Sequence, residues 1–502
     1  MTETTRSRDT DPLLSRDSAE LHRVHHPHDE LRHSFDATSD EEQHLQPTSP
    51  TDTFPHTPKI DYWNGLALII GLQIGSGIFS SPGMITSHVN SLGASLVVWL
   101  VSGLLAWTGA ATYAELGTSL PESGGPKAYF ARVYGPLPSF LFLFTVIGCL
   151  KPGTVAIIAV VFASYATRMF GVESHEGSVL ERCIAVGIIW CVISINMLGA
   201  KEGMRVGRYL AVLKVSAVCS VAVLGAATLL SGHAVPDFKR PLFEGSSTDL
   251  GDYALAFYSS LWAYEGWDNV NYITADLHNP TRLLPLILHS AQPLVITLYL
   301  LATLSYSTAL PFPLLTSSHA IAVDFADAVV GRWGGVVFGG VVAASCVGAL
   351  NATVFTASRL CTVAGSDGSI PRIFGWVHPE RGTPIPGLLL QGSIGMLLVL
   401  LIPTFSRLTA FYGICGLAWY FTVGVAACVL RFKEPGLVRP YKASWGTLLG
   451  FVGVGGFMLV RGVIAEPGMT VAVSGFFVLG IVVFFLKGQP KMVTAPNDVG
   501  GN

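Results

Sequence analysis

Charged residues are scarce in this chain. Asp, Glu, Lys and Arg make up 13% of its 502 residues, roughly half the fraction that is usual in soluble globular proteins. Half of the residues are hydrophobic, and the mean hydropathy is +0.52. This balance excludes a soluble domain as the main body of the protein. It also excludes a membrane β-barrel, because barrel strands are short and alternate between polar and apolar residues.

Cysteine is sparse, and no polar loop contains a cysteine pair. All eight cysteines lie in or beside apolar segments, where a thiol acts as a small packing residue. A disulfide framework is therefore not expected. Motifs for nucleotide binding, nucleophilic catalysis and metal binding are missing as well. We expect neither an enzyme nor a cofactor, a metal ion or a nucleic-acid partner.

Residues 1–60 lack any apolar segment. They contain twelve acidic and six basic residues, and their Ser, Thr, Pro and Asp content predicts a disordered cytoplasmic tail. Without an apolar core, this tail is not a signal peptide. Within it, Asp9, Leu13 and Leu14 resemble an acidic dileucine signal, for which a sorting adaptor would be the partner. Residues 487–502 form a second, shorter cytoplasmic tail.

Between the tails the sequence predicts an all-α membrane domain over residues 61–486. Twelve apolar segments are each about long enough to cross a bilayer as a helix. They lie near 62–86, 93–116, 139–166, 182–199, 209–231, 252–275, 286–310, 333–357, 386–403, 409–430, 447–464 and 470–486. Loops after even-numbered segments carry thirteen Lys and Arg, against seven on the other side. This excess predicts that both termini are cytoplasmic.

The first apolar segment contains Gly75, Ser76 and Gly77 at its centre. Three small residues in a row favour an interruption of the helix, which a membrane tolerates only where the backbone lines a cavity or is covered by protein. The amides at the start of the second half-helix would carry partial positive charge and suit a carboxylate. The segment therefore predicts a substrate site at bilayer depth, typical of a transporter. Close helix packing is the alternative role for Gly75 and Gly77.

The sixth apolar segment is also interrupted, because Glu265, Gly266, Asp268, Asn269 and Asn271 lie near its centre. Interrupted helices five segments apart are typical of an inverted five-plus-five repeat. The two repeats would cover residues 62–231 and 252–430, with two extra helices over 447–486. Two helices that are merely kinked at glycine are the alternative.

At this point the chain resembles a known family, the amino acid–polyamine–organocation transporters, and within it the L-type amino acid transporter branch, in a fungal-like and methionine permease-like form. The resemblance covers residues 60–445 and is carried by several motifs in order. They are Gly75-Ser76-Gly77-Ile78-Phe79 with Pro82, Tyr113-Ala114-Glu115-Leu116-Gly117, Ser123-Gly124-Gly125 with Tyr129, Lys151-Pro152, Ala263-Tyr264 with Gly266-Trp267 and Asn271, Asn279-Pro280-Thr281-Arg282 with Leu284-Pro285, and Arg439-Pro440-Tyr441-Lys442. The resemblance implies a LeuT-like fold, amino acid substrates and alternating access.

The resemblance also implies which residues bind the substrate. The amides of Gly75, Ser76 and Gly77 would bind the carboxylate. Carbonyls freed at the two interruptions would bind the ammonium, and the residues concerned are Gln73, Ile74, Trp262, Ala263, Glu265 and Gly266. Trp262 would be the aromatic gate over the substrate, and a core-filling role is the alternative.

Four charged side chains are expected within the membrane domain besides these main-chain groups: Lys151, Lys214, Glu265 and Asp268. Glu265 is interpreted as a proton site, a partner for a cationic substrate, or half of an ion pair. Lys151 lies about 18 Å from either end of its segment, too far to snorkel, so Glu265 or Asp268 would pair with it. Lys214 either snorkels or, as the resemblance implies, replaces a sodium ion. Transport would then be sodium-independent, coupled to protons or proceeding by exchange or uniport.

Together these observations predict a permease for amino acids, most of all large neutral ones, methionine included. A receptor that senses amino acids without net transport and an exchanger of cationic and neutral amino acids are the alternatives. The expected location is the plasma membrane or a vacuolar or endosomal membrane. The loop over 167–181 contains no cysteine, so no disulfide-linked heavy chain is expected.

Overall fold

The computed structural model describes residues 60–487, with gaps at 121–124, 173–174, 176, 199–200 and 403. Side chains are described over the same ranges except at 201–211, 272–273 and 275–276. Apart from Ile60 and Lys487, both predicted tails lie outside the described residues, as do the Asp9–Leu13–Leu14 pattern within the first tail, Ser123 and Gly124.

Helices occupy all twelve predicted segments. They are α1 (Tyr62–Gln73) with α2 (Gly77–Val89), α3 (Leu92–Ser119), α5 (Pro136–Thr145) with the π-helix η2 (Val146–Leu150) and α6 (Lys151–Met169), α7 (Val179–Leu198), α8 (Lys201–Leu230), α9 (Leu250–Ala263) with the 3-10 helix η4 (Trp267–Asp276), α10 (Pro280–Ala309), α13 (Arg332–Ser366), α14 (Ile385–Leu401), α15 (Phe405–Lys433), α16 (Trp445–Ala465) and α17 (Pro467–Lys487). Shorter helices between them are α4 (Pro126–Tyr134), η3 (Pro236–Lys239), α11 (Phe312–Ser317), α12 (Ile321–Val330) and η5 (Arg372–Gly375). Within the described ranges the β pairing is limited to one isolated bridge, between Ile60 and Leu277.

The lengths of these helices confirm an all-helical membrane protein. Among the described residues, nine helices are long and apolar enough to cross a bilayer. The pair α1 and α2, bent by 43° at its break, gives a tenth candidate crossing when it is counted as one span. The other two predicted crossings are α14, which has 17 residues, and α9 continued by η4. The count of twelve crossings and the repeat boundaries stay predictions.

The last two helices expose apolar side chains widely. Val471 and Leu486 on α17 are 72% and 82% exposed, and only 17% of the apolar stretch of this helix is buried. An apolar surface of this extent suits contact with lipid rather than with water. The two helices therefore line the outside of the bundle.

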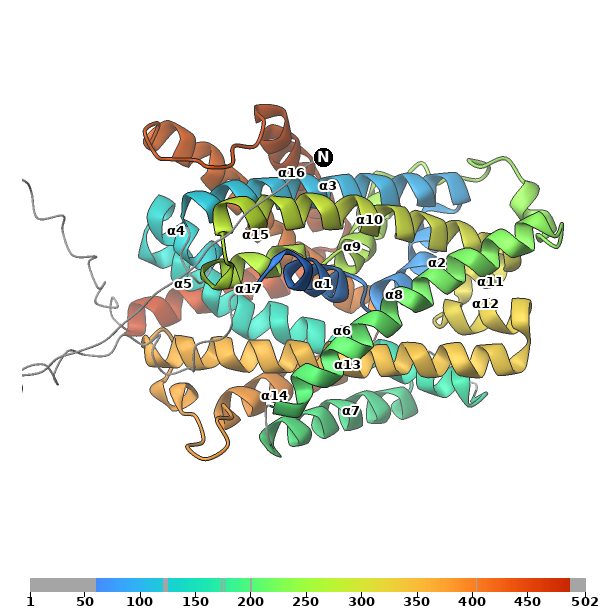
Figure 1. Ribbon diagram of the computed structural model, residues 1–502, viewed down its shortest axis with the longest axis horizontal. Coiled ribbons are helices and arrows are strands. Elements are labelled where there is room, and N and C mark those ends of the chain that lie inside the picture. Colours follow the sequence, from blue (N-terminus) through green and yellow to red (C-terminus); the bar gives the residue numbers. More distant parts are fainter. Residues whose placement is uncertain are drawn as a thin grey trace, which may run out of the picture. The chain divides into compact units, whose positions relative to one another are not determined.

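Three helix pairs pack closely and surround the breaks. In Figure 1, α3 lies along α10 and α6 lies beside α13, in agreement with their contacts. The half-helix α2 packs against α9, which brings the two interrupted spans together although about 180 residues separate them. A buried aromatic cluster of Trp99, Tyr264 and Tyr299 fills the space between α3, α9 and α10.

Candidate substrate site

Both predicted interruptions are present. Helix α1 ends at Gln73 and α2 begins at Gly77, while α9 ends at Ala263 and η4 begins at Trp267. Gly266 has φ +116°, a backbone conformation that a side chain would strain. The second break thus depends on glycine, and the alternative of two continuous, merely kinked helices does not describe these spans.

The main chains of the two breaks touch at Gly77. A Cβ placed on Gly77 would lie 2.5 Å from the Cα of Ala263 and 2.8 Å from its Cβ. A Cβ on Gly75 would meet nothing closer than the carbonyl oxygen of Leu72, at 3.7 Å. Close packing, which we considered for both glycines, therefore applies to Gly77 and not to Gly75.

Two of the three amides expected to bind the carboxylate remain available. The Gly75 amide donates to the carbonyl oxygen of Gln73 at 2.8 Å. For the amides of Ser76 and Gly77, the described part of the chain provides no main-chain acceptor. They lie at the start of α2, where the helix dipole adds partial positive charge. This pair can hold a carboxylate.

Two of the carbonyls expected to bind the ammonium, those of Gln73 and Ala263, lie beside the Tyr299 hydroxyl. Its oxygen is 2.6 Å from the Gln73 carbonyl oxygen and 2.9 Å from that of Ala263, and its single hydrogen is donated to one of them at a time. The Gln73 carbonyl also accepts from the Gly75 amide, whereas the Ala263 carbonyl has no second main-chain donor among the described residues and keeps at least one lone pair. The side-chain amide of Gln73 donates to the Tyr264 carbonyl at 3.1 Å. Ala263 therefore remains available for an ammonium, and Gln73 does not unless Tyr299 moves.

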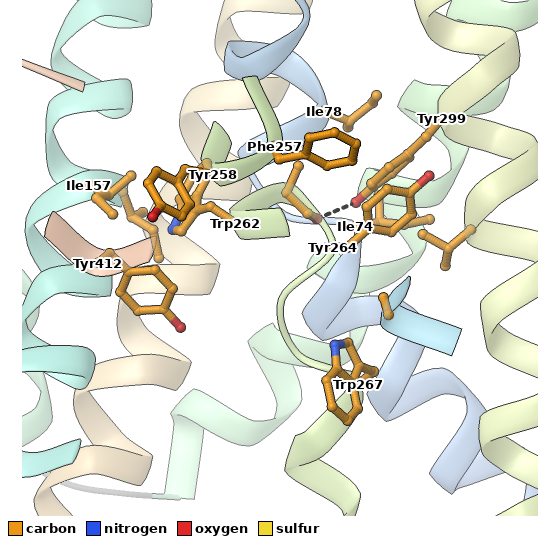
Figure 2. Packing of buried hydrophobic residues seen from close by; sticks show 14 of the residues in the cluster. Ile74, Ile78, Ile157, Phe257, Tyr258, Trp262, Tyr264, Trp267, Tyr299 and Tyr412 are labelled. Atoms are coloured by element: carbon orange, nitrogen blue, oxygen red, sulfur yellow. Dashed lines mark hydrogen bonds between the residues drawn. The ribbon is translucent and has the colours of Figure 1, made fainter. Parts of the chain in front are cut away.

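Trp262 lies at the end of α9, close to both breaks. Its side chain is 6% exposed, and its ring packs edge-on against Phe405 with centroids 5.3 Å apart. Figure 2 shows it on the same side of the break as Ile157 and Tyr412, away from Tyr264 and Tyr299. This position suits an aromatic cover over a substrate, and it equally suits a core residue.

Glu265, Asp268 and Lys151 lie close together on one side of the breaks. The charge of Lys151 acts on both carboxylates, and Glu265 also interacts with the hydroxyls of Tyr412 and Thr154. Within the described residues, no nitrogen–oxygen contact of ion-pair length joins Lys151 to either acid. All three side chains are partly exposed rather than sealed in the core. Lys151 thus interacts electrostatically with both carboxylates and forms an ion pair of contact distance with neither.

Lys214 on α8 lies within the bundle. It is only 5% exposed, so its ammonium does not reach the surface as a snorkelling lysine would. It interacts electrostatically with the Cys346 thiol on α13, which in turn interacts with the Ser76 hydroxyl. Lys214 therefore lies next to the contact between α13 and the break after α1.

Sequence reasoning missed the contacts that close the site toward α12. The Tyr165 hydroxyl on α6 donates to the Phe79 carbonyl at 2.5 Å and lies 3.3 Å from the Ala322 amide. Arg168 pairs with Asp324 at 2.5 Å, and Ser318 donates to the same carboxylate. These contacts join α6, α2 and α12. A small cavity of about 30 Å³ lies near them, beside Ser80, Ser164 and Phe405.

The motif residues at the other end of the bundle also meet. Glu115 on α3 accepts from Arg431 at 2.8 Å and from the Ala443 amide at 2.9 Å, and Arg439 lies 3.5 Å away. Tyr129 lies 3.5 Å from the Asn271 side chain. Motif residues that are far apart in the sequence therefore meet at two places in this end of the bundle. In this conformation the side toward α12 is closed, while Glu265 and Lys151 on the other side stay partly exposed.

Comparison with known proteins agrees with this arrangement. The profile of one family, described as amino acid permease, matches residues 60–495. The chain belongs to the amino acid permease family. This permease is 34% identical over 427 residues to the b(0,+)-type amino acid transporter 1 of Mus musculus, covering 84% of this chain and 86% of the relative. It is 31% identical to the human cystine/glutamate transporter over 76% of each chain. It is 30% identical to the large neutral amino acids transporter small subunit 2 of Mus musculus, over 84% of this chain and 79% of that one.

These matches confirm the expected superfamily and its L-type branch, and they confirm that the permease is a transporter rather than an enzyme. They do not distinguish a fungal-like or methionine permease-like sub-branch, which stays a prediction. The relatives differ in the substrates that their names give. The choice of substrate in this permease therefore has to be argued from its own site.

Proposed function

We propose that this permease carries amino acids across a membrane by alternating access and without sodium. The observation that carries the proposal is the meeting of the two breaks. The amides of Ser76 and Gly77, which have no main-chain acceptor among the described residues, supply donors for a carboxylate, and the Ala263 carbonyl keeps at least one lone pair for an ammonium. The contacts between α6, α2 and α12 close one side of this site, as one state of an alternating-access cycle requires.

Sodium independence rests on Lys214. An ammonium beside Cys346 and Ser76 supplies the positive charge that a coordinated cation would otherwise supply between α8, α13 and the first break. A second cation at the same place would be repelled. We therefore propose proton coupling, exchange or uniport in place of sodium coupling.

The proposed substrates are large neutral amino acids, methionine included. Ile157, Tyr258 and Tyr412 lie on the same side of the break as Trp262 (Figure 2), and all three are apolar or aromatic. One observation favours a second candidate, an exchanger of cationic and neutral amino acids. Two carboxylates, Glu265 and Asp268, interact with the single positive charge of Lys151. When both are ionised, the net charge of the cluster is negative and attracts one more cation.

Uptake of labelled amino acid into proteoliposomes tests this function. The permease should accumulate methionine at the same rate with and without sodium, and preloading with unlabelled amino acid should accelerate uptake if it exchanges. Lysine as competitor separates the two substrate classes. Saturable binding without accumulation would contradict transport and support the sensing receptor instead.

We also propose that the permease works without a disulfide-linked heavy chain, in the plasma membrane or in a vacuolar or endosomal membrane, with both termini cytoplasmic. The support is the absence of cysteine from residues 167–181. Cys183 is exposed, but it already lies within α7. Gel electrophoresis of the protein from its native membrane, with and without reductant, tests this. A reductant-sensitive band of higher mass would contradict it.

A further inference from the structure

Span three contains a π turn directly before Lys151. Over Val146–Leu150 the helix widens, and the Lys151 amide donates to the Val146 carbonyl, five residues back. The next residue, Pro152, has no amide hydrogen to donate. The Ile147 carbonyl therefore loses both donors that its own helix could offer. Single π turns of this kind are frequent at functional sites.

A glutamine from a different helix supplies the missing donor. The side-chain nitrogen of Gln391 on α14 donates to the Ile147 carbonyl at 3.0 Å, and it lies 3.3 Å from the Cys361 sulfur. Gln391 is fully buried. A buried carbonyl without any donor would be costly, so this bond favours the π turn over a regular helix.

The π turn determines where the Lys151 ammonium lies, because it rotates every following residue of α6 relative to α5. Lys151 acts on Glu265 and Asp268 without an ion-pair contact to either, so no direct bond to an acid holds it in place. We propose that Gln391 is a positioning residue, which holds the π turn and thereby the Lys151 ammonium opposite Glu265 and Asp268. The proposal rests on the proposed function, in which this cluster takes part in transport.

Other titratable groups lie around this cluster and the π turn. Those that face it or lie next to the π turn are Glu265 and Asp268 after α9, Tyr412, Tyr420 and Cys415 on α15, Cys149 in the π turn and Cys361 on α13. Cys149 and Cys415 contact each other, with their sulfurs 3.4 Å apart, and not Lys151.

Two single variants and their combination test the proposal. Lys151→Met removes the charge, and Gln391→Leu removes the donor while keeping most of the volume. Loss of the nearby positive charge makes the two carboxyls easier to protonate, so both variants should move the midpoint of the pH profile of uptake upward, by about 0.5 to 1 unit. KM for methionine should rise in both. Cys361→Ala, which removes only the sulfur contact of Gln391, should leave profile and KM unchanged.

The double variant decides whether Gln391 acts through Lys151. If it does, Gln391→Leu combined with Lys151→Met should match Lys151→Met alone. Without the Lys151 ammonium, the loss of Gln391 has nothing left to displace, so the effects of the two substitutions do not add. Effects on midpoint and KM that add would overturn the proposal, and so would an unchanged profile in Gln391→Leu. Should Gln391→Leu fail to fold, Gln391→Asn takes its place, since the shorter amide cannot reach Ile147.

The same cycle can be measured without transport, on the temperature of thermal unfolding in detergent. Non-additive shifts are expected there too, and additive ones contradict the positioning role. If the unmodified permease shows no uptake at all, the proposed function is wrong. The unfolding temperatures still test whether Gln391 acts through Lys151.

Discussion

The hydroxyl of Tyr299 lies 2.6 Å from the main-chain oxygen of Gln73, at the point where the first span is interrupted. The same hydroxyl lies 2.9 Å from the main-chain oxygen of Ala263, where the sixth span is interrupted. One side chain of α10 therefore bridges both breaks. A phenol has a single hydrogen, so it donates to one carbonyl at a time. A substrate ammonium at Ala263 would leave Tyr299 to donate to Gln73.

Tyr299→Phe tests this bridge. The variant leaves a buried carbonyl without a donor, which costs about 1–3 kcal/mol, and kcat/KM of uptake should fall about tenfold or more. Tyr306→Phe is the matched control. It lies two turns further along α10 and its buried hydroxyl has no hydrogen-bond partner in the described part of the chain, so uptake should stay near normal. Equal uptake by both variants would show that the bridge is dispensable.

The two glycines of the first break should respond differently to an added methyl group. Gly77→Ala places a Cβ against the main chain of Ala263, and uptake should be abolished, as it should in Gly77→Val. Gly75→Ala meets only ordinary contacts and should keep at least part of the uptake. Surface expression of all three is measured alongside uptake. Normal uptake by Gly77→Ala would contradict the close approach of the two breaks.

Glu265→Gln tests whether this carboxylate carries the proton. The neutral side chain cannot change its charge between pH 5 and 8, so the pH dependence of uptake should flatten. Glu244→Gln is the control, because Glu244 is exposed in the loop before α9. A profile identical to that of the unmodified permease would remove Glu265 from coupling and leave the roles of cationic-substrate partner or electrostatic partner of Lys151.

Lys214→Ala removes a buried ammonium from the contact between α8, α13 and the first break. Uptake should fall at least tenfold, and sodium should not restore it. Lys239→Ala, at an exposed position in η3, should transport normally. The two variants are compared at matched expression in sodium-containing and sodium-free buffer. A near-normal rate in Lys214→Ala would mean that its charge does not support this contact.

The sequence predicted the helices well because apolar runs of bilayer length have few other outcomes. The segment expected at 386–403, for example, is α14 over Ile385–Leu401. The breaks were predictable too, since Gly75 and Gly77 bracket Ser76 and a run of polar residues follows Ala263. The 3-10 form of η4 and the π turn before Lys151 were not predicted. Each depends on which carbonyl a given amide donates to in the folded bundle.

The residues that join the breaks or hold the π turn were not predictable from one sequence. Tyr299 contacts Gln73 across 226 positions, and Gln391 contacts Ile147 across 244. Neither residue stands out in its own helix, where a tyrosine or glutamine has several ordinary roles. The same holds for Tyr165 and for the pair of Arg168 and Asp324. Composition and spacing predict the secondary structure of a segment. The contacts between helices depend on which helices pack together in the folded bundle.

Substrate recognition in this permease depends most on the amides of Ser76 and Gly77, which we propose to bind the substrate carboxylate. Competition against labelled methionine in proteoliposomes tests this directly, with unlabelled methionine and its methyl ester as competitors. The two competitors share the side chain and the ammonium, and only the free acid carries the carboxylate. The free acid should inhibit uptake, and the ester at the same concentration should not. Equal inhibition by both would show that these amides do not bind the carboxylate.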